Sequence, residues 1–231
     1  IASKNVRVIA DLQPRKAWCT HSGIVHIARR NGAWGNNPTT LHHETGHSIL
    51  DKAGQGSDQP IRQELLPIWT TAKQELQEFC EKAFGETWDR DTKRLKERNW
   101  YKKIAIKVFG LTENEYNALN DAQRSRYGNF CDMMGAISSG RRFYGHSPQY
   151  YGTGPARGLH ELVANATAVL CDSGLLAKGR TIFPKTLARI EIDPVRCGIV
   201  NAEHVLSALG AGTRGRESTA EYRFVRGATF P

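Results

Sequence analysis

The stretch His43-Glu44-Thr45-Gly46-His47 decides how this chain is interpreted. Residues four positions apart on an α-helix lie one above the other on the same face, so both imidazoles can bind one metal ion without bending the backbone. Glu44 points slightly away from that line, where it can contact a water molecule on the metal rather than the metal itself. This arrangement is typical of the metal-binding helix of zinc hydrolases, and a surface helix with incidental histidines is the alternative interpretation.

The sequence on both sides of the motif predicts the limits of its helix. A loop rich in Gly and Asn runs from Arg29 to Pro38, and Thr39 or Thr40 can cap the helix that follows. We expect that helix from about Leu41 to Lys52, because glycines at positions 54 and 56 stop it.

Short apolar runs before the motif predict a small N-terminal sheet. Val6 to Ala10 is one strand, and the runs Ala17 to Thr20 and Ile24 to Ala28 flank a turn-like His21-Ser22-Gly23 and so predict a hairpin. The second hairpin strand precedes the loop that leads into the metal helix. We expect it to be an edge strand whose free backbone groups can pair with an extended peptide.

Helical patterns dominate the rest of the chain, which predicts an α+β fold that is mostly helical. Pro67 should kink the first of these helices or mark its true start, and Thr112-x-x-Glu115 is a capping box. The expected helices run over Ile61 to Phe84, from Thr112 towards Arg124, Tyr127 to Ile137, Gly158 to Leu176, Pro184 to Ile192 and Asn201 to Leu209. We expect an exposed irregular loop from Arg141 to Pro155 and an extended or partner-bound tail from Gly210 onward.

Composition bounds the class of protein. With 231 residues and 39% hydrophobic residues, the chain is long enough to bury a core and is typical of soluble globular proteins. No apolar run approaches the ~20 residues that a membrane-spanning helix needs. None of the five cysteines forms a C-x-x-C pair, so a cysteine-rich zinc knuckle is not expected, and their odd number argues against a complete disulfide framework.

The net charge of +9 is partly local. The segment 90–107 has only Asp91 and Glu97 against eight basic residues: Arg90, Lys93, Arg94, Lys96, Arg98, Lys102, Lys103 and Lys107. Such a segment is either a solvated helix face or a surface that contacts phosphates, so nucleic acid or virion proteins are candidate partners.

A catalytic zinc ion needs three protein ligands and one open position. The spacing that places a third histidine at position 53 fails, because Ala53 stands there. Glu64 is a possible third ligand, but it lies close to a helix-breaking proline. Glu161 is the better candidate, because Glu161, Asn165 and Ala168 form a small, polar helix face that lets two helices approach closely. His160 projects about 100° away from Glu161 and is not chosen.

These motifs together resemble a known family. His43-Glu44-Thr45-Gly46-His47 followed far downstream by Glu161-Leu162-Val163-Ala164-Asn165-Ala166 resembles the zincin domains of the anthrax lethal factor type, and especially the version found in phage minor head proteins and bacterial toxins. Asp132 to Ser138 and Tyr144 to Tyr151 resemble segments between the two motifs in the phage group. The resemblance covers roughly Trp18 to Leu176.

The resemblance implies a fold, a cofactor and further site residues. It implies a zincin-like metallopeptidase domain within residues 1–176. The basic helical segment at about 86–110 departs from a compact core of this type, so we expect it to be an insertion. The resemblance does not cover residues 177–231, which we expect to form a helical extension and tail. Zn²⁺ would be bound by His43, His47 and Glu161. A tyrosine upstream of the ligand Glu would stabilise the oxyanion, with Tyr151 as the best match and Tyr150 as the alternative. His146 can face the same cleft.

We therefore predict a zinc endopeptidase that hydrolyses peptide bonds in a protein or peptide substrate, with Glu44 as general base. The alternative is a structural component of a phage virion that keeps a zincin fold and contacts DNA. A third interpretation is a nucleic-acid-binding module with incidental histidines. A virion or the host cytoplasm is the favoured location, and a secreted toxin is the other possibility.

Overall fold

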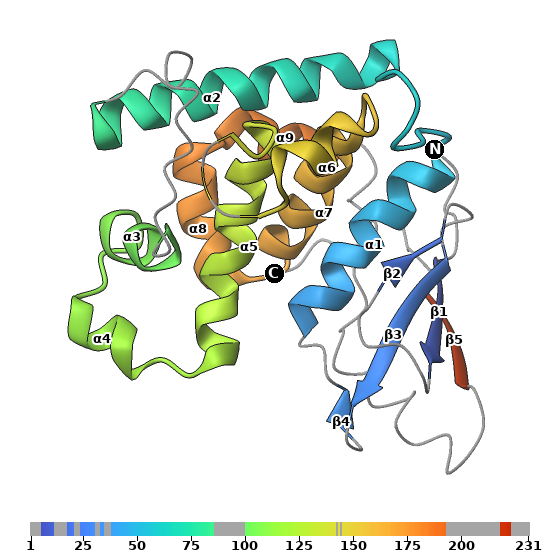
Figure 1. The fold of residues 1–231 in the computed structure, drawn as a ribbon, viewed down its shortest axis with the longest axis horizontal. Helices are drawn as coiled ribbons and strands as arrows, with labels where there is room; N and C mark the ends of the chain where they lie inside the picture. Colours follow the sequence, from blue (N-terminus) through green and yellow to red (C-terminus); the bar gives the residue numbers. More distant parts are fainter. Residues whose placement is uncertain are drawn as a thin grey trace.

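The computed structural model describes residues 6–11, 18–20, 24–30, 33–34, 38–85, 100–141, 143, 145–192 and 218–222. These residues form a body of helices beside a small sheet, and helix α1 (Pro38–Lys52) lies between the two (Figure 1). The expected mostly helical fold with a small sheet is confirmed.

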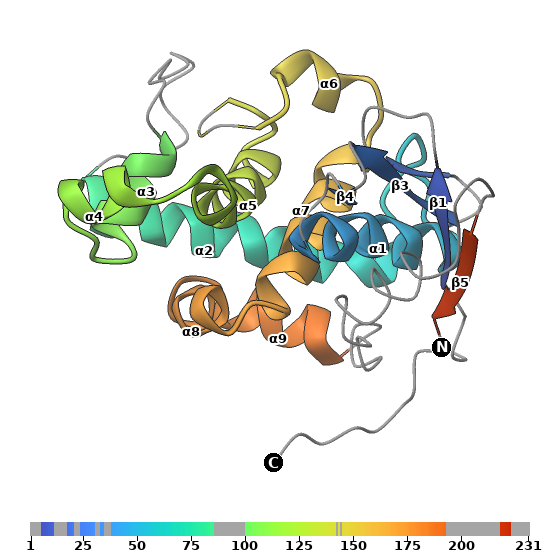
Figure 2. The same ribbon diagram turned by 90° about the horizontal axis from the view of Figure 1, so that it is seen from below.

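The sheet joins the two ends of the chain. Strand β1 (Val6–Asp11) pairs in parallel with β3 (Ile24–Arg30) and antiparallel with β5 (Ser218–Tyr222). On its other side β3 pairs antiparallel with β2 (Trp18–Cys19), so the strand order is β2-β3-β1-β5. The short strand β4 (Ala33–Trp34) also pairs antiparallel with β3, outside this order. Figure 2 shows β5 at the side of the sheet away from α1.

This topology confirms the predicted first strand and hairpin pairing but corrects the predicted edge. We expected Ile24 to Ala28 to be an edge strand. The prediction was wrong, because β3 has partners on both sides, and β2 is the edge next to it among the described strands. The hairpin turn, His21 to Gly23, lies outside the described residues.

Helix α1 begins earlier than predicted. It starts at Pro38, so Thr39 and Thr40 lie inside the first turn and are not its caps. Proline suits the first turn, because its fixed φ is helical and its missing N–H would have no partner there. The helix ends as predicted: Gly54 has a φ of +84°, and the Gln55 N–H donates to the Leu50 carbonyl at 3.0 Å.

Residues at the helix starts also determine where the next helices begin. A 3₁₀ turn (Gln63–Leu65) leads into α2 (Leu66–Phe84), with Pro67 in its first turn, so the proline marks the true start. The Thr112–Glu115 capping box opens α4 (Glu113–Ala118), which follows α3 (Trp100–Lys107).

The predicted helix from Thr112 towards Arg124 was too long. It breaks at Leu119, and a second capping box, formed by Asn120 and Gln123, starts α5 (Asp121–Ile137).

Two further predicted boundaries were wrong. The expected irregular loop from Arg141 to Pro155 contains a short helix, α6 (Pro148–Gly152), which Ser147 caps. The expected helix from Gly158 to Leu176 is instead α7 (Arg157–Leu170) and α8 (Ser173–Ile182), because Asp172 caps α8 and ends the continuity. The predicted helix at Pro184 is α9 (Pro184–Ile192), and the one at Asn201 to Leu209 lies outside the described residues.

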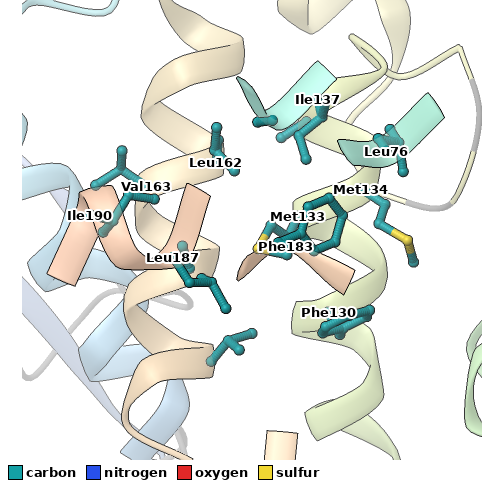
Figure 3. Packing of buried hydrophobic residues seen from close by; sticks show 14 of the residues in the cluster. Leu76, Phe130, Met133, Met134, Ile137, Leu162, Val163, Phe183, Leu187 and Ile190 are labelled. Atoms are coloured by element: carbon teal, nitrogen blue, oxygen red, sulfur yellow. The ribbon is translucent and has the colours of Figure 1, made fainter. Parts of the chain in front are cut away.

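The core forms around α5 and α7. Every residue from Gly158 to Val169 is buried, so α7 runs through the interior of the helical body. Figure 3 shows apolar side chains from α5 facing those of α7 and the segment around α9. The fully or almost fully buried side chains labelled there are Leu76, Phe130, Met133, Met134, Ile137, Leu162, Val163, Phe183, Leu187 and Ile190.

The C-terminal part packs onto the rest. The expected domain boundary at residue 176 falls inside α8, α9 packs against α2 and α7, and β5 completes the sheet beside β1. Within the expected insertion, residues 86–99 lie outside the described residues, and α3 packs on α5 through the buried Ile104. Among the described helices, none combines the length and apolar character that crossing a membrane requires.

The cap of α8 yields a stability prediction. Asp172 Oδ1 accepts the Gly174 and Leu175 N–H groups, and both its oxygens bind the Arg126 guanidinium at 2.6 and 2.7 Å. Replacing Asp172 with Ala should lower the free energy of unfolding by about 1–3 kcal/mol at pH 7, since a cap and a charge-assisted pair are both lost. Urea unfolding of both proteins measures this difference.

The stability lost in D172A should depend on pH, because the Asp172 carboxylate can be protonated. Partial burial raises the pKa of Asp172, but Arg126 and the backbone donors outweigh it, so the pKa lies below its ordinary value. A lowered folded pKa stabilises above the unfolded pKa of about 3.9, and the contribution disappears as pH falls through the folded pKa. The difference between D172A and the wild type should therefore shrink at acid pH, and an unchanged difference at pH 3 would contradict this assignment.

Candidate metal centre

Two helices from distant parts of the sequence bring the predicted ligands together. Helix α1 carries His43 and His47, and α7 carries Glu161. The helices pack at Gly46, where a Cβ atom would lie only 2.5 Å from the Ala164 Cα and 3.0 Å from its backbone N. Because other residues carry a Cβ atom, glycine is required for this close approach.

The three predicted ligands are close enough to hold a metal ion. Their donor atoms all lie within 4.8 Å of one another. The two Nε2 atoms are 3.2 Å apart, His43 Nε2 lies 3.6 Å from Glu161 Oε2, and His47 Nε2 lies 3.7 Å from Glu161 Oε1. A tetrahedral zinc ion with bonds of about 2.0–2.1 Å separates its donors by about 3.3–3.4 Å, so these residues fit such an ion.

The other possible third ligand does not reach the histidines. Glu64 lies in the 3₁₀ turn before α2, its side chain is exposed, and it pairs with Arg62. Glu161 by contrast has a side chain only 3% exposed, so it does not face solvent. Only Glu161 therefore joins the two histidines among the described residues.

Side chains behind the ligands fix their orientation. Asn165 Oδ1 lies 3.2 Å from His43 Nδ1, and Asn165 Nδ2 donates to the Glu161 carbonyl at 2.9 Å. With Nδ1 donating to Asn165, the lone pair of His43 is on Nε2, the atom that faces His47 and Glu161. The His47 ring stacks on His160, whose Nε2 donates to the Gln55 carbonyl at 2.6 Å.

The protonation states suit a metal ion. Burial lowers the pKa of His47 to about 3, and burial also lowers the pKa of His43 against the opposing charge of Glu161. Burial raises the pKa of Glu161, but the neighbouring histidines and Tyr150 outweigh it, so its pKa lies below the ordinary value. Neutral imidazoles and an ionised carboxylate are the forms that bind a metal.

Glu44 faces the same space without joining the ligand set. Its side chain is largely buried and lines a cavity of about 380 Å³ beside the two histidines. Burial, with a smaller contribution from the charge of Glu161, raises the pKa of Glu44 to about 8. A cation held by His43, His47 and Glu161 would oppose both effects and favour the ionised carboxylate.

The structure separates the two candidate tyrosines. Tyr150 lines the cavity, and its hydroxyl donates to Glu161 Oε1 at 2.7 Å. Tyr151, the residue favoured by the sequence, is buried in the hydrophobic core and is not among the residues that line the cavity. Adjacent residues on α6 point about 100° apart, so only one of them can face the site.

Sequence reasoning did not assign several residues of the cavity. His146 stacks on Tyr150 with ring centroids 3.9 Å apart, and its Nε2 lies 3.4 Å from Glu161 Oε1, which places it at the cleft as one alternative expected. The described lining consists of Cys19, His43, Glu44, His47, Asp51, Ser57, His146, Tyr150, Arg157, His160 and Glu161. Arg157 lies four positions before Glu161 on α7, a spacing that could have revealed it.

No protein-family model, curated protein or solved structure matches this chain. The resemblance to lethal-factor-type zincins consequently stays a prediction from the sequence motifs. Any functional assignment depends on the geometry of the residues that line the cavity.

Proposed function

We propose that this chain is a zinc-dependent endopeptidase of the zincin type. The observation that carries the proposal is the convergence of His43, His47 and Glu161 beside a cavity that Glu44 also lines. Two imidazoles and one carboxylate are a ligand set of catalytic zinc sites in metallopeptidases.

The donor types favour zinc over other common ions. Calcium and magnesium prefer sets of six or more oxygen ligands, whereas two of the three donors here are imidazole nitrogens. The distances between these donor atoms, 3.2 to 3.7 Å, also agree with a small tetrahedral ion.

The open side of the site favours catalysis over a purely structural metal. A structural zinc ion is normally closed by four protein ligands, whereas a catalytic one keeps a position for water or substrate. Here the described residues supply three, and the side chains of His43 and His47 are 20% and 16% exposed at the cavity.

The roles of the protein groups follow from their positions. Zinc would supply Lewis acidity that makes a water molecule more acidic and a carbonyl more electrophilic. Glu44 would take a proton from the water as its oxygen attacks the carbonyl carbon, and would return that proton to the amine nitrogen as the C–N bond breaks. The Tyr150 hydroxyl, rather than that of Tyr151, would donate to the oxyanion.

The sheet offers a place for the substrate chain. Among the described strands β2 is the edge beside β3, and Cys19 from β2 lines the cavity. An extended peptide can pair with the backbone of an edge strand. We therefore assign substrate alignment to β2, in place of the strand that the sequence suggested.

A cleavage screen with metal analysis tests the proposal. The zinc-loaded wild-type chain should hold one zinc ion by elemental analysis and cleave members of a proteome-derived peptide library, and a chelator should stop the cleavage. H43A should lose most of its zinc and its cleavage together, because two ligands remain. Cleavage that persists in H43A at the wild-type rate would show that the activity does not belong to this site.

The same screen tests the structural alternative. A protein that binds zinc, melts at a lower temperature without it and cleaves nothing would have a structural metal, as a virion component with this fold would. Contact between the basic segment 90–107 and nucleic acid or virion proteins stays a prediction. Within its described part, Lys102 already pairs with Glu113 at 3.2 Å.

A further inference from the structure

Arg157 brings a positive charge into the cavity. It is the first residue of α7 and precedes Glu161 by four positions, so the two side chains lie on the same face of the helix. Among the described residues that line the cavity, it is the only Lys or Arg.

The guanidinium is held in place rather than free in solvent. Its central carbon lies over the Tyr150 ring, 4.9 Å from the ring centroid, which is within the range of a cation–π contact. At the other end of the side chain, a Cβ atom on Gly154 would lie 3.1 Å from the Arg157 Cγ, so the stem packs against the backbone. A side chain fixed at both ends loses little freedom when it binds a ligand.

No carboxylate of the described residues neutralises this guanidinium. Its Nε is buried without a hydrogen-bond partner there. Arg126 and Arg62 differ from Arg157 in having carboxylate partners, since Arg126 binds Asp172 and Arg62 binds Glu64. The Nε atom itself is out of reach of solvent, so a carboxylate that enters the cavity would pair with the terminal nitrogens of the guanidinium.

We propose that Arg157 binds a carboxylate of the substrate close to the scissile bond, a proposal that rests on the peptidase function above. The planar guanidinium can bind both oxygens of a carboxylate. The Tyr150 hydroxyl donates to Glu161, and the Tyr150 ring lies against the Arg157 guanidinium. The guanidinium is therefore separated from the metal ligand Glu161 by a single tyrosine side chain.

The preference should be confined to one substrate position. Glu44 and Asp51 also line the cavity, and both come from α1 rather than α7. Their charges disfavour acidic peptides in general. Only a carboxylate that reaches the guanidinium gains from it, and that group is either an acidic side chain or the C-terminal carboxylate.

Peptide hydroxamates test the pocket separately from turnover. The probes are short peptides with a metal-chelating hydroxamate, identical except for Glu or Gln at one position, each with a free or an amidated C-terminus. Their affinities for the zinc-loaded chain are measured by calorimetry for wild type, R157Q and R189Q. Arg189 is exposed on α9 and does not line the cavity, which makes R189Q the matched control.

We expect wild type and R189Q to bind one carboxylate-bearing probe about tenfold more tightly than its neutral partner, as one charge-assisted pair allows. R157Q should lose this ratio and bind the neutral probe as wild type does, which also shows that it is folded. The Glu–Gln pair and the free–amidated pair identify the source of the carboxylate.

Two results would overturn the inference. If the neutral and charged probes bind wild type equally, or if the preference persists in R157Q, Arg157 does not bind the carboxylate. Either result leaves the proposed peptidase function standing, because the hydroxamates still bind the metal site. If no hydroxamate binds the wild-type chain and no peptide is cleaved, the peptidase function fails and this inference fails with it.

Discussion

Replacing Glu44 with glutamine is expected to lower kcat for peptide cleavage by about 10²–10⁴-fold, the usual contribution of a general base. Gln has nearly the same shape but cannot accept the proton of the attacking water. Glu44 is outside the ligand set, so E44Q should hold as much zinc as wild type. Steady-state kinetics on one cleaved peptide, with elemental analysis of each protein, measures both quantities.

The control for this variant is E78Q. Glu78 is an exposed glutamate on α2, where it accepts a hydrogen bond from Gln74, and its replacement should leave kcat unchanged. An E44Q protein that keeps its zinc and has a kcat within threefold of the wild-type value would contradict the assignment of Glu44 as general base. Loss of zinc in E44Q would instead show that this carboxylate helps to hold the metal.

Replacing Gly46 with alanine should disturb both the fold and the metal centre through one added methyl group. Alanine in place of glycine inside a helix ordinarily stabilises by about 1 kcal/mol. Here the added Cβ would lie 2.5 Å from the Ala164 Cα and 2.9 Å from Thr167 Oγ1. Since carbon atoms pack at about 3.5–4.0 Å, helices α1 and α7 must move apart by about 1 Å.

This movement should affect stability and metal binding together. Overpacking of this kind costs about 1–3 kcal/mol, which for a chain of this size lowers Tm by roughly 2–12 °C. The same shift separates His43 and His47 from Glu161, so zinc affinity should fall at least tenfold. Thermal unfolding with and without zinc, together with a competitive zinc titration, measures both effects.

The matched control is G152A. Gly152 ends α6, and a Cβ there would meet nothing within 4 Å. This variant should unfold and bind zinc as wild type does. If G46A matched G152A in both measurements, the close packing of α1 on α7 would not be what holds the site together.

Local chemistry made several elements predictable from the sequence. The two histidines of α1 are four residues apart, so their common face follows from helix geometry alone. The capping box at Thr112 and the proline at the start of α2 act on backbone groups a few residues away. The small, polar residues around Glu161 and Asn165 likewise predicted that another helix lies close to α7. The structure shows that the closest approach is between Gly46 of α1 and Ala164 of α7.

The predicted structure was wrong in a short region where residues typical of loops lie beside a helix-capping signal. The residues around Tyr150 are rich in Gly and Tyr and suggested a loop, but Ser147 and Pro148 start a single helical turn. That turn decides which tyrosine faces the cavity, because it rotates Tyr151 into the core and Tyr150 towards Glu161. A strand likewise cannot be assigned to an edge from its own residues, since the edge depends on which strands pair with it.

The sequence by itself determined the helix that presents two imidazoles and a carboxylate, because those relations span only five residues. Tertiary structure alone decided that Glu161, 114 positions after His47, comes within 3.7 Å of it, that Tyr150 rather than Tyr151 lies at the cavity, and that Arg157 has no acidic partner in the described chain. The physical reason is that the interactions involved act over different distances along the chain. Helix periodicity and capping act within one turn, whereas the spacing of α1 and α7 is set by the packing of side chains from the whole core.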